Sequence, residues 1–157
     1  MKPELEKTLA VLKMLCQKLD SDKIPWILTG STSLILQGVD VPLKDIDILV
    51  SSDDCRKISV LLADYIVEAP NDVSETDKYR SNYDKYNIDG IEVDILGNFQ
   101  YKLPDGSWSK IKDMNDCKTL EYAGIKWRVL PLEEELKEYR AVGRNDKVEA
   151  ILRKLND

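Results

Sequence analysis

The stretch Trp26-Ile-Leu-Thr-Gly-Ser-Thr-Ser33, followed by Asp45-Ile-Asp47-Ile, decides the fold of this chain. A short apolar run, residues 24–28, leads into the Gly30-Ser31 turn, and a second apolar strand carries the two aspartates. Residues i and i+2 of a strand point to the same face, so Asp45 and Asp47 are parallel carboxylates. They repel each other unless a cation lies between them. Mg²⁺ is the usual cation, because it binds carboxylates together with nucleotide phosphates.

A third apolar strand, Ile91-Glu-Val-Asp94-Ile-Leu, supplies a further carboxylate. Glu92 lies on the same strand face as Asp94 and is an alternative third ligand. The isoleucines that flank Asp47 indicate a buried face, which leaves the aspartates facing solvent or a cleft. The sequence therefore predicts a divalent-metal site shared by two strands and placed beside the glycine-serine turn.

Gly30-Ser31, Asp45-x-Asp47 and the distant Asp94 between Val93 and Ile95 resemble the motif of the nucleotidyltransferase superfamily, typified by DNA polymerase beta. The closer resemblance is to small members: minimal nucleotidyltransferases, lincosamide and aminoglycoside nucleotidylating enzymes, and toxin-type relatives. It covers residues 24–96 well and residues 138–147 more weakly. We prefer Asp94 to Glu92 because the resemblance places the carboxylate immediately before the last apolar pair of its strand.

The resemblance implies transfer of a nucleoside monophosphate from a triphosphate, with ATP expected, to an acceptor hydroxyl. Two Mg²⁺ ions, or Mn²⁺ in their place, would activate the nucleophile and neutralise the leaving oxygens. Asp45 and Asp47 would bridge both ions, and Asp94 would bind only the ion at the attacking oxygen. Gly30 would let the backbone approach the triphosphate, and Ser31 would donate to its terminal phosphates.

Four basic residues are candidates for binding the triphosphate: Lys44, Arg140, Arg144 and Lys147. The relatives usually carry lysine where Arg140 stands, and a Lys-Asp pair where this chain has Asp146-Lys147, so a solvated helix end is the alternative. Arg80 is a weaker basic candidate. Several aromatic residues could stack on a base or an acceptor, although strand spacing equally favours packing on a sheet face: Tyr79, Tyr83, Tyr86 and Trp108.

The amino-acid composition excludes several classes of catalytic and metal site. The chain has 157 residues, 43% hydrophobic and 33% charged, which fits one globular domain over residues 1–157. It contains no histidine, which excludes Ser-His-Asp triads and histidine metal sites. The net charge of −6 argues against nucleic acid as the main partner. Three cysteines without CxxC spacing, no secretory pattern and no membrane-length apolar run predict a cytoplasmic protein.

Periodicity predicts an α/β fold with a small mixed sheet flanked by helices. The core is expected over residues 22–97 and the C-terminal helices over residues 131–156. An amphipathic helix is predicted over residues 4–20, and a mobile loop over residues 68–77. Asp89-Gly90 predicts a tight hairpin turn. The remaining expected helices are residues 31–38, a segment capped by Ser51 or Ser52, and residues 132–142 and 146–155; the expected strands are residues 24–28, 45–50, 83–88, 91–96, 119–122 and 125–130.

Three functions remain open from the sequence. The first is the nucleotidyltransferase, with a small molecule, a protein or an RNA end as acceptor. The second is a non-catalytic nucleotide-binding or regulatory module of the same fold, as in a toxin–antitoxin pair. The third is a carboxylate-rich metal protein of another fold, such as a phosphatase or nuclease. The short chain leaves little room for an acceptor domain, so the C-terminal helices or a second copy, as in a homodimer, would complete the acceptor site.

Overall fold

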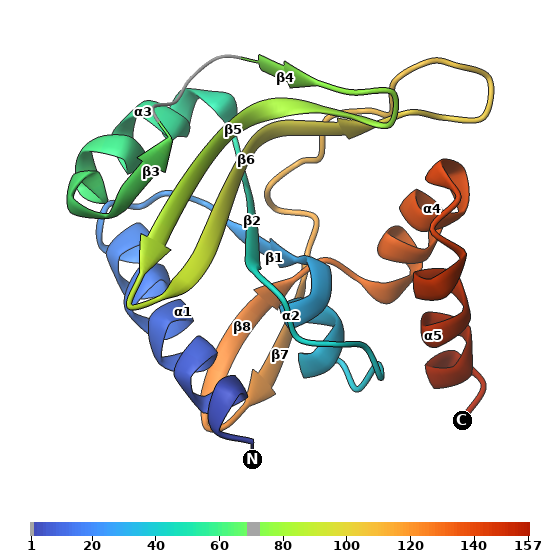
Figure 1. Ribbon diagram of the computed structural model, residues 1–157, viewed down its shortest axis with the longest axis horizontal. Helices are drawn as coiled ribbons and strands as arrows, with labels where there is room; N and C mark the ends of the chain where they lie inside the picture. Colours follow the sequence, from blue (N-terminus) through green and yellow to red (C-terminus); the bar gives the residue numbers. More distant parts are fainter. Residues whose placement is uncertain (1, 69–72) are drawn as a thin grey trace.

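The computed structural model describes residues 2–68 and 73–157. Figure 1 shows a mixed sheet with helices around it, which confirms the predicted α/β class. The elements follow in this order: α1 (Pro3–Ser21), β1 (Ile27–Thr29), α2 (Gly30–Leu36), β2 (Ile46–Val50), α3 (Ser52–Leu61), η1 (Ala63–Tyr65), β3 (Ile66–Glu68), β4 (Val73–Glu75), β5 (Tyr79–Ile88), β6 (Ile91–Tyr101), β7 (Lys118–Tyr122), β8 (Ile125–Val129), α4 (Leu132–Val142) and α5 (Asn145–Leu155).

The strand order is β3-β5-β6-β2-β1-β8-β7, and β4 pairs with β5. Strand β2 is antiparallel to β1 and parallel to β6, so it lies at the centre of the functional strands. The register pairs Asp47 with Thr29 on one side and with Asp94 on the other. The motif segments, far apart in the sequence, therefore meet on three adjacent strands.

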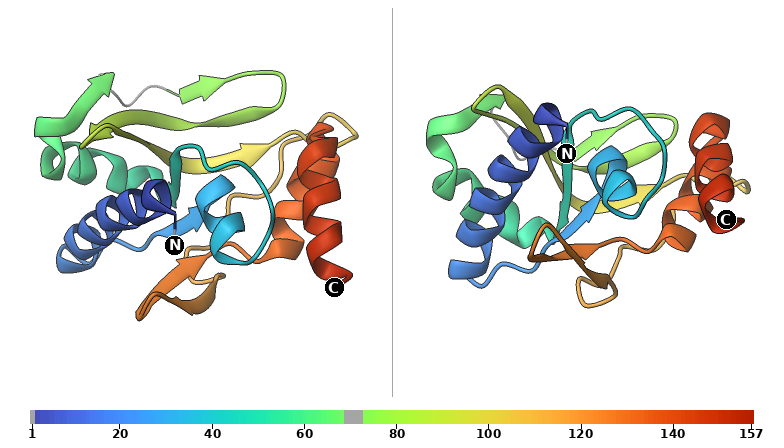
Figure 2. Two further views of the ribbon diagram at one scale, coloured as in Figure 1. Left: turned by 60° about the horizontal axis from the view of Figure 1, so that its bottom comes forward. Right: turned by 90° about the horizontal axis from the view of Figure 1, so that it is seen from below.

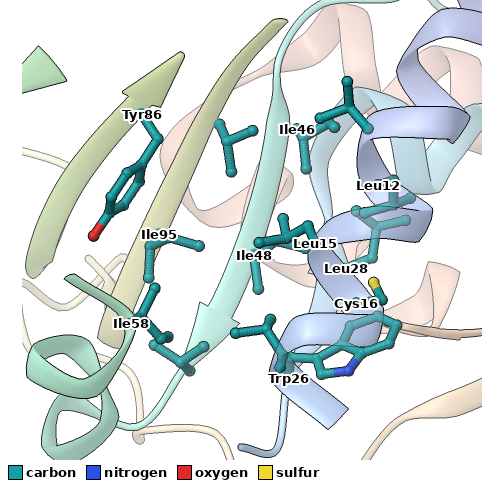
Figure 3. Close-up of a cluster of buried hydrophobic side chains, with 14 of the residues drawn as sticks. Leu12, Leu15, Cys16, Trp26, Leu28, Ile46, Ile48, Ile58, Tyr86 and Ile95 are labelled. Atoms are coloured by element: carbon teal, nitrogen blue, oxygen red, sulfur yellow. The ribbon is translucent and has the colours of Figure 1, made fainter. Parts of the chain in front are cut away.

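One face of the central strands forms the main core. Ile46 and Ile48 of β2 and Ile95 of β6 are fully buried there, against Leu12 and Leu15 of α1 (Figure 3). Because side chains alternate along a strand, this burial directs Asp45, Asp47 and Asp94 to the opposite face. The predicted amphipathic helix thus fixes which face of the sheet carries the carboxylates.

Helices α4 and α5 form a second unit at the far end of the molecule from α1 (Figure 2). They pack through a smaller apolar cluster that includes Leu34 of α2, Leu136 of α4 and Ile151 of α5. Gly143 has φ +78° and ends α4, so Arg144 lies in the bend between the two helices. Only glycine adopts that left-handed conformation without steric cost. Helices α4 and α5 therefore pack on α2, the helix that begins at the glycine-serine turn.

The structure corrects the predicted loop over residues 68–77. Glu68 ends β3, and Val73–Glu75 forms β4, which pairs with β5 over residues 80–82. Residues 69–72 lie outside the described residues. The exposed edge of β5 supplies hydrogen-bonding partners that a polar local sequence does not predict. Strand β5 also begins earlier than expected, at Tyr79, which places Arg80 in a strand rather than a loop.

Other boundaries differ by a few residues. The first strand begins at Ile27 rather than at residue 24, since Pro25 cannot donate a ladder hydrogen bond. The Asp89-Gly90 turn is confirmed, and both residues have positive φ. No helix in the described part of the chain combines the length and apolar character that crossing a bilayer requires.

Candidate active site

Four carboxylates gather on the open face of β2 and β6. Asp47 and Asp94 are paired in register on the two parallel strands. Asp45, Glu92 and Asp94 each offer an oxygen, and these three oxygens lie within 4.8 Å of one another. The geometry therefore brings together the three predicted aspartates and also Glu92, the alternative ligand. Lys85 of β5 lies at the edge of this group, with its Nζ 3.5 Å from Glu92 Oε1.

Burial, and then mutual repulsion, raises the pKa values of the three aspartates. Burial, then Glu92 and Asp94, raises the pKa of Asp45 to about 6. Burial, then Asp94 and Asp45, raises the pKa of Asp47. Burial also raises the pKa of Asp94, although a hydrogen bond from the Tyr83 hydroxyl opposes this. The carboxyl groups of Asp47 and Asp94 interact directly, and positive charge between them would relieve their repulsion.

The donor set fits a hard divalent cation. Asp94 is 7% exposed, and its Oδ1 is buried without a hydrogen-bond partner among the described residues. A buried unpaired carboxylate oxygen is costly unless a cation or donor satisfies it. Carboxylate oxygens are the preferred protein ligands of Mg²⁺, and Mn²⁺ binds the same donors. These residues can therefore hold the metal that the sequence predicts.

The glycine-serine turn lies directly beside this group. Gly30 has φ +74°, and any Cβ at this position would collide with Asp47 Oδ2. The Gly30 N–H donates to Glu135 Oε1 at 2.7 Å, so it is already engaged. Ser31 is buried, and its Oγ accepts a hydrogen bond from the Lys44 backbone N–H at 3.0 Å. The absence of a side chain at Gly30 thus makes room for the Asp47 carboxylate, and Ser31 holds the segment that carries Lys44.

Three of the four predicted cations are brought together, and Arg140 is not one of them. Lys147 is 7% exposed, and burial, then Arg144 and Lys44, lowers its pKa. Arg140 is exposed and lines a groove with Leu103 and Pro104 on another side of α4. Because Gly143 ends α4, Arg144 leaves the helical path and does not share a face with Arg140.

A cleft of about 300 Å³ lies between the carboxylate face and the C-terminal helices. One side of the cleft is lined by Gly30 at the start of α2, Asp47 of β2 and Asp94 of β6. Glu138 and Tyr139 of α4, together with Arg144, line the other side. Tyr79 and Tyr83 also line it, whereas Tyr86 is buried in the main core. Arg80 and Trp108 stack on each other outside this cleft.

The sequence reasoning missed two buried glutamates of α4. Glu135 is fully buried, and burial raises its pKa to about 7. Glu138 is 7% exposed, and burial, then Glu135 and Asp47, raises its pKa to about 8. Glu133, Glu134 and Glu135 together form an acidic first helical turn, which ordinarily indicates solvent-exposed dipole partners. The signal in the sequence was that Glu135 lies at helical spacing from Leu132, and Glu138 at helical spacing from Glu135, which places them on the buried side of α4.

Comparison with known proteins identifies the family of this chain. The model of the aminoglycoside-2″-adenylyltransferase family matches residues 11–151, nearly the whole chain. The chain belongs to this family. An inferred nucleotidyltransferase from Thermotoga maritima is 34% identical with a TM-score of 0.79, over 96% of this chain and 94% of that one. No curated protein sequence matches the chain.

A second solved structure shares the fold. ANT(2″)-Ia, in complex with adenylyl-2″-tobramycin, superposes with a TM-score of 0.57 over 95% of this chain and 90% of that one. Its sequence identity is 11%, so the likeness concerns the fold alone. The family membership confirms the prediction of a nucleotidyltransferase-type enzyme, and it excludes the alternative of a phosphatase or nuclease of another fold.

Proposed function

We propose that this adenylyltransferase-family member transfers a nucleoside monophosphate from a triphosphate to a hydroxyl acceptor by two-metal-ion catalysis. The observation that carries the proposal is the register of Asp47 beside Asp94, with Asp45 next to them and the side-chain-free Gly30 alongside. No other arrangement in the described residues combines oxygen ligands for a metal with an open cleft and nearby cations. We take residues 1–157 as one catalytic domain, since the cleft needs both the strands and α4.

Asp45, Asp47 and Asp94 are the proposed ligands of Mg²⁺ or Mn²⁺, with Glu92 at the edge of the set. When bound, the metal supplies positive charge that neutralises the phosphates and increases the acidity of the acceptor hydroxyl. Asp94 is the proposed base that takes the hydroxyl proton, because it lines the cleft and its buried Oδ1 has no hydrogen-bond partner within residues 2–68 and 73–157.

In the proposed reaction the acceptor oxygen forms a bond to the α-phosphorus of the triphosphate. The bond from this phosphorus to the bridging oxygen breaks, and pyrophosphate leaves with its electrons. Lys44, Arg144 and Lys147 are the proposed phosphate-binding cations, since Arg144 lines the cleft and Lys44 and Arg144 are electrostatic neighbours of Lys147. Ser31 holds Lys44 in place through the hydrogen bond to its backbone and is the proposed hydroxyl donor to a terminal phosphate.

We propose ATP as donor and a small molecule as acceptor. The family model is named for adenylyl transfer to an aminoglycoside, and ANT(2″)-Ia was solved with an adenylylated tobramycin. A cleft of about 300 Å³ with several carboxylates suits a small hydroxylated molecule better than an RNA end, given the net charge of −6. The three free cysteines are consistent with action in the cytoplasm.

The test is incubation of the protein with each α-labelled triphosphate, Mg²⁺ and either a panel of aminoglycosides or a small-molecule cell extract. The proposal predicts a labelled small molecule, pyrophosphate release and a preference for ATP. The Asp94→Asn variant should lose this labelling, whereas Asp113→Asn, at an exposed carboxylate that does not line the cleft, should retain it. Tight nucleotide binding without transfer to any acceptor would instead favour the non-catalytic nucleotide-binding module. Sedimentation of the active protein tests whether a homodimer forms.

A further inference from the structure

Glu135 makes the most direct contact between the C-terminal helices and the glycine-serine turn. Its Oε1 accepts a hydrogen bond from the Thr29 hydroxyl at 2.6 Å and another from the Gly30 N–H at 2.7 Å. The side chain is fully buried, and more than 100 residues separate it from its partners in the sequence. Ordering a long carboxylate this way costs side-chain entropy and desolvation, so a simple surface role does not explain it.

The turn that Glu135 holds is in direct contact with the metal site. Asp47 Oδ2 lies so close to Gly30 that an added Cβ would collide with it. The position of Gly30 therefore limits where the Asp47 carboxylate can lie. A shift of the turn would move the wall against which this carboxylate rests, and with it the distance between Asp47 and Asp94.

Glu135 also faces the proposed phosphate-binding cations. Lys147 of α5 is an electrostatic partner of Glu135 and a neighbour of Arg144 and Lys44. Tyr139, one helical turn after Glu135, is an electrostatic neighbour of it. Its other oxygen, Oε2, is buried without a hydrogen-bond partner in the described part of the chain. The carboxyl group thus joins the cation cluster on one side to the Gly30 turn on the other.

We propose that Glu135 is a positioning residue, which fixes Thr29 and Gly30 so that Asp47 is held in register with Asp94 and the phosphate-binding cations. The proposal rests on the proposed function, because it assigns a role within that reaction. Glu135 touches neither substrate nor metal in this account. Its essential property is a hydrogen-bond acceptor at Oε1, and a charge at this position is not required.

Two variants separate these properties. Glu135→Gln keeps an acceptor oxygen in the same place, whereas Glu135→Leu removes it and keeps a similar volume. Thr29→Val removes one of the two donors without changing the shape of the side chain. Glu133→Leu is the matched control, because Glu133 is exposed on the same helical turn. Thermal unfolding of each variant establishes that it is folded.

The first readout is steady-state transfer with ATP. Glu135→Leu should lower kcat about tenfold to hundredfold with KM for ATP changed less than about threefold, because misplacement by ~1 Å costs up to ~10²-fold in rate. Glu135→Gln and Glu133→Leu should stay close to the parent. Thr29→Val should lower kcat in the same direction, and its effect should not add to that of Glu135→Leu, since both remove one interaction.

The second readout does not need activity. In nuclear magnetic resonance spectra, the Gly30 amide should exchange faster and the Asp47 carboxylate signal should shift in Glu135→Leu, but not in Glu135→Gln or Glu133→Leu. A folded Glu135→Leu protein with parental kcat would overturn the proposal. Equal losses in Glu135→Gln and Glu135→Leu would also overturn it. So would tighter ATP binding with faster turnover in Glu135→Leu, because Glu135 would then inhibit the reaction in the parent.

The two proposals fail differently. If the parent transfers to no acceptor, the proposed function fails, and the spectra then decide the positioning role alone. An unchanged Gly30 amide in Glu135→Leu would overturn it under those conditions. If Glu135→Leu does not fold, the comparison of Thr29→Val with Thr29→Ser replaces it, because serine keeps the hydroxyl donor. Equal turnover of these two variants would then contradict the proposal.

Discussion

Asp47 on β2 and Asp94 on β6 stand side by side at matched positions of two parallel strands, although 47 positions separate them in the sequence. Burial, and then the neighbouring charge of Asp94, raises the pKa of Asp47. Such a pair is unfavourable when both members are ionised. A divalent cation held between the two carboxylates would relieve this repulsion.

Replacing Asp47 with Asn tests the role of this pair in binding. The change removes a formal charge and keeps the shape, so affinity for Mg²⁺-ATP should fall steeply. Metal-free ATP should bind no worse, because repulsion between the carboxylate and the phosphates is relieved. Titration calorimetry with and without Mg²⁺ measures both affinities, and Asp113→Asn is the control. Equal Mg²⁺-ATP binding by Asp47→Asn and the parent would rule out this role.

Divalent metal should stabilise the parent, and more strongly above neutral pH than below it. Metal binding requires ionised carboxylates, and the pKa of Asp45 is raised to about 6. A ligand at a hundred times its Kd stabilises the folded state by about 2.7 kcal/mol. Thermal unfolding with Mg²⁺ or Mn²⁺ at about pH 5.5 and 8.5 checks this expectation. The same shift in Asp47→Asn as in the parent would show that the metal binds elsewhere.

The metal-free protein should lose stability as the pH rises from about 5 to about 8. Burial raises the pKa of Glu135 to about 7 and that of Glu138 to about 8, from an ordinary value of 4.5. Within this window the folded state binds more protons than the unfolded state, so unfolding becomes more favourable as protons are withdrawn.

Urea unfolding across this pH range measures the slope, and Glu138→Gln should reduce it because the amide does not titrate. Glu133→Gln, at an exposed position, should leave the slope as it is in the parent. A free energy of unfolding that increases between pH 6 and pH 8 in the metal-free parent would contradict the raised pKa values of both buried glutamates.

The cations near the cleft should differ in their effect on ATP affinity. Arg144→Gln and Lys147→Gln should each raise KM for ATP about tenfold to hundredfold, because a lost charge-assisted hydrogen bond to phosphate costs about 1.5–3 kcal/mol. Arg140→Gln should leave KM unchanged, since Arg140 lies in a different groove. Initial rates over a range of ATP concentrations measure these values. A larger effect of Arg140→Gln than of Arg144→Gln would contradict the assignment of the phosphate-binding end.

The carboxylate face could be predicted because strand alternation is a strictly local rule. Ile46 and Ile48 identify the buried face of β2, and Asp45 and Asp47 must then lie on the other. The same rule placed Asp94 and left Glu92 as an alternative, and the structure brings both near Asp45. Local patterning therefore sufficed wherever neighbouring residues alone decide the direction of a side chain.

The contacts between distant segments could not be predicted in this way. Glu135 meets Gly30 only because α4 and α5 pack on α2, and no local pattern encodes that packing. Arg140 and Arg144 are four residues apart and would share a face of one continuous helix, but Gly143 ends α4 between them. Strand β4 is stabilised by hydrogen bonds to the edge of β5, and the local sequence of β4 does not show that partner, so the segment was predicted as a loop.

The central claim is that Asp94 serves the attacking hydroxyl, and the Asp94→Asn variant tests it most directly. The variant should bind Mg²⁺-ATP nearly as well as the parent, because Asp45 and Asp47 remain. Its rate of transfer to the best acceptor should fall at least about a hundredfold, which is ~2.7 kcal/mol of barrier at ~1.36 kcal/mol per tenfold. Parental transfer by Asp94→Asn would contradict the account and would move the assignment to Glu92.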